Sequence, residues 1–154
     1  MVTKRKVPAK RAAATRRKPV RFEDLTVQDI LNPRVQSARL DLAGEQVAAL
    51  LLKAGGAVPV VDRSKQLVGV VSEHDVLLAI EEEPAWGTRR VRDLMSANPY
   101  SVRPETSLPT LVHVLTESDL LSVPVVDGAN RLLGVVTRRD VIRVALRRAV
   151  KRRS

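Results

Sequence analysis

Hydrophobic and polar residues alternate with two periodicities along the chain, one helical and one typical of strands. The order in which these periodicities occur predicts the secondary structure. From near Asp41, apolar residues recur at helical spacing through VAALLLKA, and the same spacing returns from Ser107 through LVHVLTES. Each segment leads into two β-branched runs that flank a polar turn, DRSKQ or DGANR, which indicates a β-hairpin. A further helix is predicted to begin at Ser72 and at Thr137. A brief strand is expected before each first helix, at residues 35–37 and 100–102.

The two halves of this pattern are copies of one another. Between Val58 and Val76, 11 of 19 positions are identical to those between Val123 and Val141, at a constant offset of 65. A repeat of this size indicates a duplicated structural unit with the order β-α-β-β-α. Helical signals stop between the units, at the Pro and Gly of EEEPAWGTRR. The predicted boundaries are unit 1 at 22–83, a linker at 84–90 and unit 2 at 91–148.

The charge of the chain is concentrated at its two ends. The formal net charge is +10, yet residues 1–21 carry nine Lys or Arg and no acid, and residues 138–154 carry eight against Asp140 alone. The body between them is acidic, with 10 basic and 16 acidic residues. We expect a disordered basic tail at 1–21, which lacks the apolar stretch of a secretory signal and shares the acid-free, Arg-rich composition of transit peptides. A basic C-terminal end is expected at 149–154.

Composition narrows the function classes. The chain has no cysteine, which excludes disulfides and thiolate zinc sites and favours a reducing compartment, and we expect the cytoplasm. Only one Phe, one Tyr and one Trp are present, so the core must consist of aliphatic residues and aromatic stacking on nucleic acid is disfavoured. No apolar run reaches the roughly 20 residues that span a membrane. His74 and His113 are the only histidines, and neither a metal site nor a catalytic constellation is predicted.

Two matched elements are the candidate binding residues, Ser72-x-x-Asp75 and Thr137-x-x-Asp140. Each has the arrangement of a helix cap, which stabilises free N–H groups by about 1 kcal/mol. Each also has the chemistry of a nucleotide site, because a carboxylate accepts hydrogen bonds from both hydroxyls of a ribose and a helix start favours a nearby phosphate. The two interpretations are compatible.

The repeated PVVD, followed by GVV, a hydroxyl residue and Asp, resembles the tandem cystathionine β-synthase domain pair, the CBS family, over about residues 25–148. The resemblance implies an α+β fold in which two repeats pack about a pseudo-twofold axis into one module. It implies clefts that bind an adenine nucleotide (AMP, ADP or ATP) or S-adenosylmethionine as a regulatory ligand, with no cofactor required. Through matched positions, it implies that Val58 and Val123 contribute an apolar wall and backbone groups for a purine.

The two clefts are not expected to be equivalent. Arg138 and Arg139 carry charges suited to phosphate, whereas Glu73 repels it and His74 helps only when it is protonated or donates a hydrogen bond. We therefore predict that the Thr137 cleft prefers phosphorylated ligands and that the Ser72 cleft prefers nucleosides or S-adenosylmethionine, or stays empty.

The resemblance also implies a homodimer that acts on a separate, unidentified regulated protein. This expectation is supported by apolar helix faces that would be partly exposed to solvent in a monomer. They comprise Val76, Leu77 and Ile80 in unit 1 and Ile142, Leu146 and Ala149 in unit 2. The alternative function is a nucleic-acid-associated protein in which basic ends bind polyanions on a dimeric scaffold.

Overall fold

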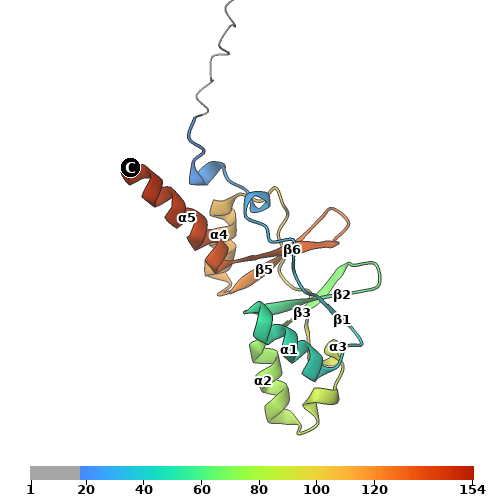
Figure 1. Cartoon of the computed structure of the whole chain (residues 1–154). Coiled ribbons are helices and arrows are strands. Elements are labelled where there is room, and N and C mark those ends of the chain that lie inside the picture. The colour runs from blue at the N-terminus through green and yellow to red at the C-terminus, as the bar shows by residue number, and fades with distance from the viewer. Residues whose placement is uncertain (1–17) are drawn as a thin grey trace, which may run out of the picture.

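Two β-hairpins of the same design form the centre of the molecule (Figure 1). The computed structural model describes residues 18–154. The first hairpin pairs β2 (Ala57–Val61) with β3 (Leu67–Ser72), and the second pairs β5 (Ser122–Val126) with β6 (Leu132–Thr137). Both are antiparallel, and both shift register at the second valine of PVVD. The duplication seen in the sequence therefore extends to the irregularities of the backbone.

A pair of longer helices accompanies each hairpin. These are α1 (Gly44–Ala54) and α2 (Glu73–Glu82) in the first half, and α4 (Leu108–Glu117) and α5 (Arg138–Arg153) in the second. Shorter elements are the 3-10 turns η1 (Phe22–Asp24), η2 (Val27–Asp29) and η3 (Trp86–Thr88), and the helix α3 (Val91–Leu94). The predicted α+β fold of two repeats is confirmed.

Three of the four longer helices begin where the sequence predicted, and one begins later. Ser72, Ser107 and Thr137 cap α2, α4 and α5, each accepting a backbone N–H in its side chain. The start expected near Asp41 is wrong, because α1 begins at Gly44. Residues 39–42 form a turn first, and a Cβ at Gly44 would lie 2.6 Å from the carbonyl oxygen of Trp86, so the entry to α1 is set by a distant segment.

The edges of the two sheets are exchanged between the sequence repeats. β4 (Ser96–Ala97), from the start of the second repeat, pairs with β3 of the first. The start of the first repeat bridges to the second half, at Thr26 with Ser107 and at Asn32 with Val135. The brief strand expected at 35–37 is shifted, since β1 is Ala38–Arg39, and at 100–102 only Val102 forms a bridge.

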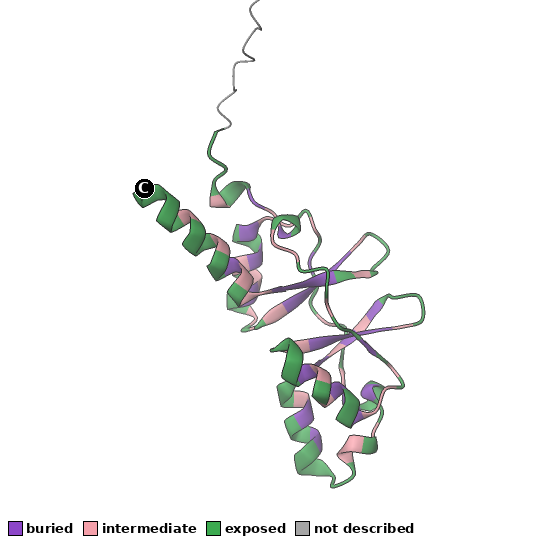
Figure 2. Ribbon diagram, in the orientation of Figure 1, coloured by how far each residue is buried: buried purple, intermediate pink, exposed green. Residues whose placement is uncertain are grey.

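Two aliphatic cores result, one in each half of the molecule (Figure 2). Both contain exchanged residues. Leu25 and Val27 pack in the core of the second half, whereas Val91 packs in the core of the first. The predicted units 22–83 and 91–148 are therefore not the same sets of residues as the two packed halves. The tail predicted at 1–21 lies outside the described residues up to residue 17, and the C-terminal end predicted at 149–154 continues α5 as far as Arg153.

The tips of the two hairpins are hydrogen-bonded to one another and join the halves. The N–H of Leu67 donates to the carbonyl of Asn130 at 2.9 Å, and the N–H of Leu132 donates to that of Lys65 at 3.0 Å. In the second turn, the carboxylate of Asp127 accepts the N–H groups of Ala129 and Arg131, and the bond from Arg131 lowers the pKa of Asp127. The reciprocal bonds place the two turns across a pseudo-twofold axis.

The turn of the first hairpin offers a test of this symmetry. Lys65 has φ 62°, and the matching position of the second turn, at φ 60°, is Asn130. Because Asn tolerates left-handed backbone better than Lys does, we expect Lys65→Asn to raise the free energy of unfolding by about 0.5–1 kcal/mol. Chemical denaturation measures the change. A destabilised variant would contradict the equivalence of the two turns.

Candidate ligand cleft between the repeats

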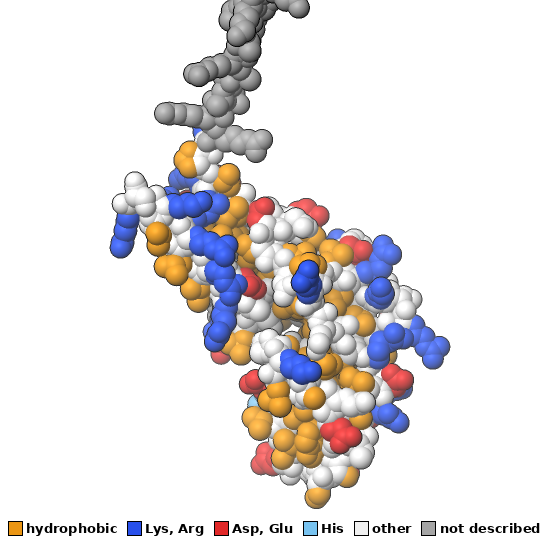
Figure 3. All heavy atoms as spheres, viewed as in Figure 1, with side chains coloured by type: hydrophobic (Ala, Val, Ile, Leu, Met, Phe, Trp, Pro, Cys, Tyr) orange, Lys and Arg blue, Asp and Glu red, His pale blue; other side chains and the backbone are white. Residues whose placement is uncertain are grey.

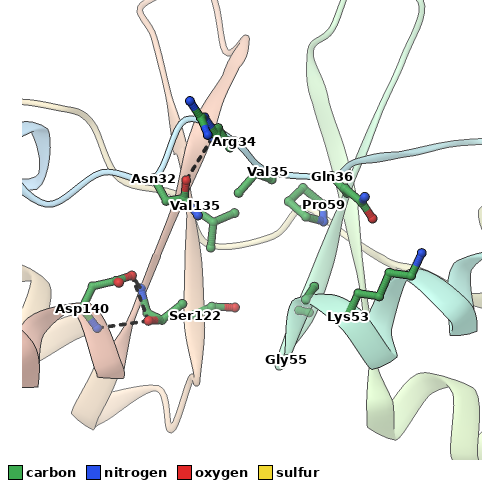
Figure 4. Close-up of a pocket in the computed structure, with 13 residues that line it drawn as sticks. Asn32, Arg34, Val35, Gln36, Lys53, Gly55, Pro59, Ser122, Val135 and Asp140 are labelled. Atoms are coloured by element: carbon green, nitrogen blue, oxygen red, sulfur yellow. Dashed lines mark hydrogen bonds between the residues drawn. The ribbon is translucent and has the colours of Figure 1, made fainter.

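A cavity of about 330 Å³ lies between the two halves, beside the first turn of α5 (Figure 4). One wall belongs to the second half and the opposite wall to the end of α1 and the start of β2. The exchanged segment 32–36 crosses between the walls. The lining residues are Ser122, Val135, Thr137 and Asp140 on the first wall, Lys53, Ala54, Gly55, Ala57 and Pro59 on the second, and Asn32, Arg34, Val35 and Gln36 in the crossing segment.

Thr137 and Asp140 form a complete capping box at the edge of this cavity. The N–H and the hydroxyl of Thr137 both donate to Oδ2 of Asp140 at 2.8 Å, and the N–H of Asp140 donates back to the hydroxyl at 3.2 Å. The other oxygen, Oδ1, accepts one bond from Arg143 at 3.1 Å, and 18% of the Asp140 side chain is exposed. A carboxylate oxygen accepts two hydrogen bonds, so Oδ1 keeps acceptor capacity toward the cavity.

The Ser72 element repeats the cap but has different surroundings. Ser72 donates its N–H and hydroxyl to Oδ2 of Asp75 at 2.7 and 2.8 Å. Oδ1 of Asp75 accepts a bond from the hydroxyl of Ser96 at 3.3 Å, and Ser96 belongs to β4, which is paired with β3 beside it. His74 is exposed. Neither Ser72 nor Asp75 lines the 330 Å³ cavity, so the two matched elements differ in what faces them.

The side chains of Val58 and Val123, expected to form an apolar wall for a purine, do not line the cavity. Both side chains are fully buried, in the first and second core respectively. Alternate residues of a strand face opposite sides, so the neighbours Ala57, Pro59 and Ser122 line the cavity instead. The side chains of Val58 and Val123 thus belong to the cores, and a purine contact through their backbone groups stays a prediction.

The two arginines expected beside the Thr137 element do not line the cavity. The guanidinium of Arg138 donates to the carbonyl of Leu120 at 2.6 Å, to that of Leu115 at 3.3 Å and to Asp119 at 2.8 Å. It thereby ties the start of α5 to the last turn of α4 and to the loop that follows it. Arg139 is exposed on α5.

Two basic residues of the first repeat line the cavity in their place. Lys53 comes from the last turn of α1 and Arg34 from the crossing segment, and both lie opposite or above Asp140 (Figure 4). The sequence analysis missed them because it assigned each cleft to the residues of a single repeat. The available signal was their asymmetry, since the matching positions of the second repeat carry Glu117 and Tyr100.

Within residues 18–154, no three side chains of His, Cys, Asp or Glu gather in a way that would hold a metal ion. Over the same stretch, the helices are too short or too polar to cross a bilayer.

Comparison with known proteins confirms the resemblance inferred from the repeats. The CBS domain family matches residues 27–82 and 91–147. The CBS domain-containing protein CBSX2, chloroplastic, of Arabidopsis thaliana is 29% identical over 83% of this chain, and the aligned part covers 66% of CBSX2. Inosine-5'-monophosphate dehydrogenase of Methanocaldococcus jannaschii is 28% identical over 67% of this chain but over only 20% of its own length. The chain thus spans less than two thirds of these relatives.

Solved structures give the same result for the fold. A crystal structure of CBSX2 in complex with AMP has a TM-score of 0.72, is 34% identical, and covers 80% of this chain and 97% of that one. The CBS domains of a transcriptional regulator from Streptococcus pneumoniae have a TM-score of 0.68 at 27% identity, with 77% and 98% covered.

Proposed function

The chain belongs to the CBS domain family, and from this we propose that it is a regulatory module that senses an adenosine-type ligand in the cleft beside Thr137. The observation that carries the proposal is the composition of the cavity. Asp140 faces it from one half, and Lys53 faces it from the other. CBSX2, a relative of similar fold, is described with AMP bound. The candidate ligands are AMP, ADP, ATP and S-adenosylmethionine.

Asp140 is proposed to hold the ribose. Its capping box fixes the carboxylate through Oδ2, so that Oδ1 is directed by the fold before any ligand arrives. Hydrogen bonds to an ionised group are stronger than neutral ones, and a pre-positioned acceptor loses less entropy on binding. The apolar surface of Ala57 and Pro59, with that of Val135, offers a site for a base next to it.

Lys53 and Arg34 are proposed to select the phosphorylated members of this class. The Asp140 charge is already paired with Arg143, so the two basic residues leave the cavity with a net positive character. A phosphate attached to a ribose on Asp140 would extend toward the opposite half. Such a ligand contacts both halves and favours the arrangement in which they lie close, which is a route from binding to a signal.

Titration calorimetry of the full chain with AMP, ATP, S-adenosylmethionine and adenosine tests this proposal. We expect Lys53→Gln to weaken AMP binding roughly fivefold, because it removes a partly solvent-exposed contact to the phosphate. The affinity for adenosine, which has no phosphate, should stay within about twofold of the wild-type value. Lys65→Gln removes an equal charge outside this cavity and is the matched control. Equal losses for AMP and adenosine in Lys53→Gln would contradict a phosphate contact.

Other parts of the proposal concern the partners of the chain. A module that binds a ligand without catalysis acts on another protein, and we propose a separate regulated protein and a homodimeric assembly. The cytoplasmic location stays a prediction.

The alternative function, a nucleic-acid-associated protein, predicts a different result for the same samples. It predicts strong, steeply salt-dependent binding of DNA or RNA through the basic ends. Nucleotide binding without such polyanion binding supports the sensing module.

A further inference from the structure

A second cavity, of about 250 Å³, lies between the two halves near the turns of the hairpins. Val61 and Lys65 line it from the end of β2 and the first turn, and Leu132 and Leu133 line it from the start of β6. Figure 4 shows both hairpins continuing past the crossing segment toward these turns. The crossing segment therefore separates the second cavity from the 330 Å³ cleft beside Thr137.

The crossing segment presents alternate residues to the two cavities. Alternate side chains of an extended segment point to opposite sides, so each side of this segment has its own set of residues. The set that lines the Thr137 cleft includes Asn32, Arg34 and Gln36, and the set that lines the second cavity is Pro33, Val35, Ser37 and Arg39. Val35 also reaches the Thr137 cleft. The two cavities are thus separate spaces on either side of one segment.

The charge of the second cavity is positive. Arg39 and Lys65 line it, and no Asp or Glu does. Within residues 18–154, neither of these cations takes part in an ion pair. The acid of the first turn, Asp62, instead accepts the N–H groups of its own turn in Oδ1. Figure 3 shows Lys and Arg side chains gathered at the edge of the molecule that carries the hairpin turns. Such a cavity attracts an anion.

The rest of the lining is aliphatic and selects the size and the body of that anion. Val35, Val61, Leu132 and Leu133 form apolar surface beside the two cations, and Leu133 is 37% exposed. An apolar cavity of about 150 Å³ holds a benzene ring in another protein, so about 250 Å³ has room for a ring of that size and a charged head. An inorganic ion alone would leave the apolar surface in contact with water.

We propose that the second cavity binds a small organic anion, in which a phosphate or carboxylate head is joined to an apolar body. The head lies between Arg39 and Lys65, where the guanidinium offers paired N–H donors and the ammonium a second charge. The hydroxyl of Ser37 is a further donor in the same lining. The body lies against Val61 and Leu133. This site needs no ligand in the Thr137 cleft and is independent of the function proposed for that cleft.

The helix faces expected to pair in the homodimer lie outside this site. They belong to α2 and α5, and neither helix contributes a residue to the second cavity. Of the apolar residues expected on these faces, Val76 is wrong, because it is buried in the first core. The others are exposed, namely Leu77, Ile80, Ile142, Leu146 and Ala149.

Three probes with the same ring and different heads test the proposal on the full chain. Phenyl phosphate, benzoate and benzamide are titrated into isotope-labelled protein, and NMR follows the backbone amides. We expect saturable shifts at Ser37, Lys65 and Leu133, with phenyl phosphate bound most tightly and benzamide at least about tenfold more weakly, since benzamide carries no charge. Equal affinities for the three probes, or no saturable shifts with either anion, would overturn the proposal.

Charge-removing variants locate the probe. Arg39→Gln should weaken phenyl phosphate binding at least about fivefold, since it removes one of the two cations. Two matched controls remove a charge elsewhere and should stay within about twofold of the wild type. They are Lys53→Gln, in the Thr137 cleft, and Arg63→Gln, on the exposed part of the first turn. A loss in Lys53→Gln as large as that in Arg39→Gln would place the probe in the Thr137 cleft and sink the proposal.

A second variant tests the apolar wall without removing a cation. Leu133→Glu puts a carboxylate into the cavity at a residue that is already partly exposed. We expect it to weaken phenyl phosphate binding at least about twentyfold by repulsion. Leu121→Glu, at an exposed residue outside the cavity, is the control and should bind the probe as the wild type does. Thermal melting confirms that each variant is folded. Unchanged probe binding in a folded Leu133→Glu variant would contradict the site.

Discussion

Asp140→Ala is expected to weaken AMP binding by at least about thirtyfold. The substitution removes the carboxylate that faces the cavity from α5, and hydrogen bonds to a charged group contribute about 1.5–3 kcal/mol each when they are shielded from water. Titration calorimetry with AMP measures the loss, and adenosine should lose affinity by a similar factor. This similarity distinguishes a ribose contact from the phosphate contact proposed for Lys53.

Asp75→Ala is the matched control for this experiment. It deletes the same capping box in the other repeat, with the same bonds to the preceding hydroxyl residue. Each substitution should therefore cost about 1 kcal/mol of stability, which thermal melting without ligand measures. Only Asp140→Ala should also lose AMP. If Asp75→Ala abolished AMP binding and Asp140→Ala retained it, both with a normal melting transition, the cleft would have been assigned to the wrong repeat.

The largest effect on stability is expected at Gly134. A Cβ there would overlap the carbonyl oxygen of Asn32 and lie 2.6 Å from Cδ1 of Leu31. Asn32 is bridged to Val135, so its backbone has little freedom to retreat. We expect Gly134→Ala to lower the free energy of unfolding by about 2–3 kcal/mol, as overpacking against backbone does. AMP binding should fall as well, because the displaced segment 32–36 lines the cavity.

Gly128→Ala separates this steric effect from the general cost of replacing glycine. At Gly128 the nearest atom to an added Cβ is Nη1 of Arg103, at an ordinary 3.5 Å. Chemical denaturation should find Gly128→Ala within about 0.5 kcal/mol of the wild type. Gly69→Ala should destabilise the other half in the same way as Gly134→Ala, since its Cβ would lie 2.9 Å from the carbonyl of Ser96, while AMP binding is retained. A Gly134→Ala variant as stable as the wild type would contradict the close approach of the backbone at Asn32 to Gly134.

These predictions share one structural cause: residues of both repeats line the same cleft. The segment at 32–36 leaves the second half, passes over the cavity and enters β1 of the first half. Ligand contacts therefore come from the cap of α5, the end of α1 and a crossing strand edge. A substitution in either repeat can change one cleft, and identical substitutions in the two repeats are expected to have unequal effects.

The sequence by itself determined the features that depend on neighbouring residues. The duplication, both hairpins and the caps at Ser72, Ser107 and Thr137 follow from period-2 and period-3.6 patterns and from turn and capping residues, all of which act over a few positions. The aliphatic nature of both cores was also predictable, since the chain has only three aromatic residues.

The tertiary structure alone decided which half each edge segment joins. Both hairpins offer an equivalent strand edge, so no local pattern distinguishes pairing within a repeat from pairing across it, and packing of Val27 and Val91 in the opposite cores selects the exchange. That exchange brings Arg34 to the Thr137 cleft, whereas hydrogen bonds to the carbonyls of Leu115 and Leu120 hold Arg138 away from it. Side-chain roles at a cleft between repeats are set by such long-range contacts, which residue spacing does not encode.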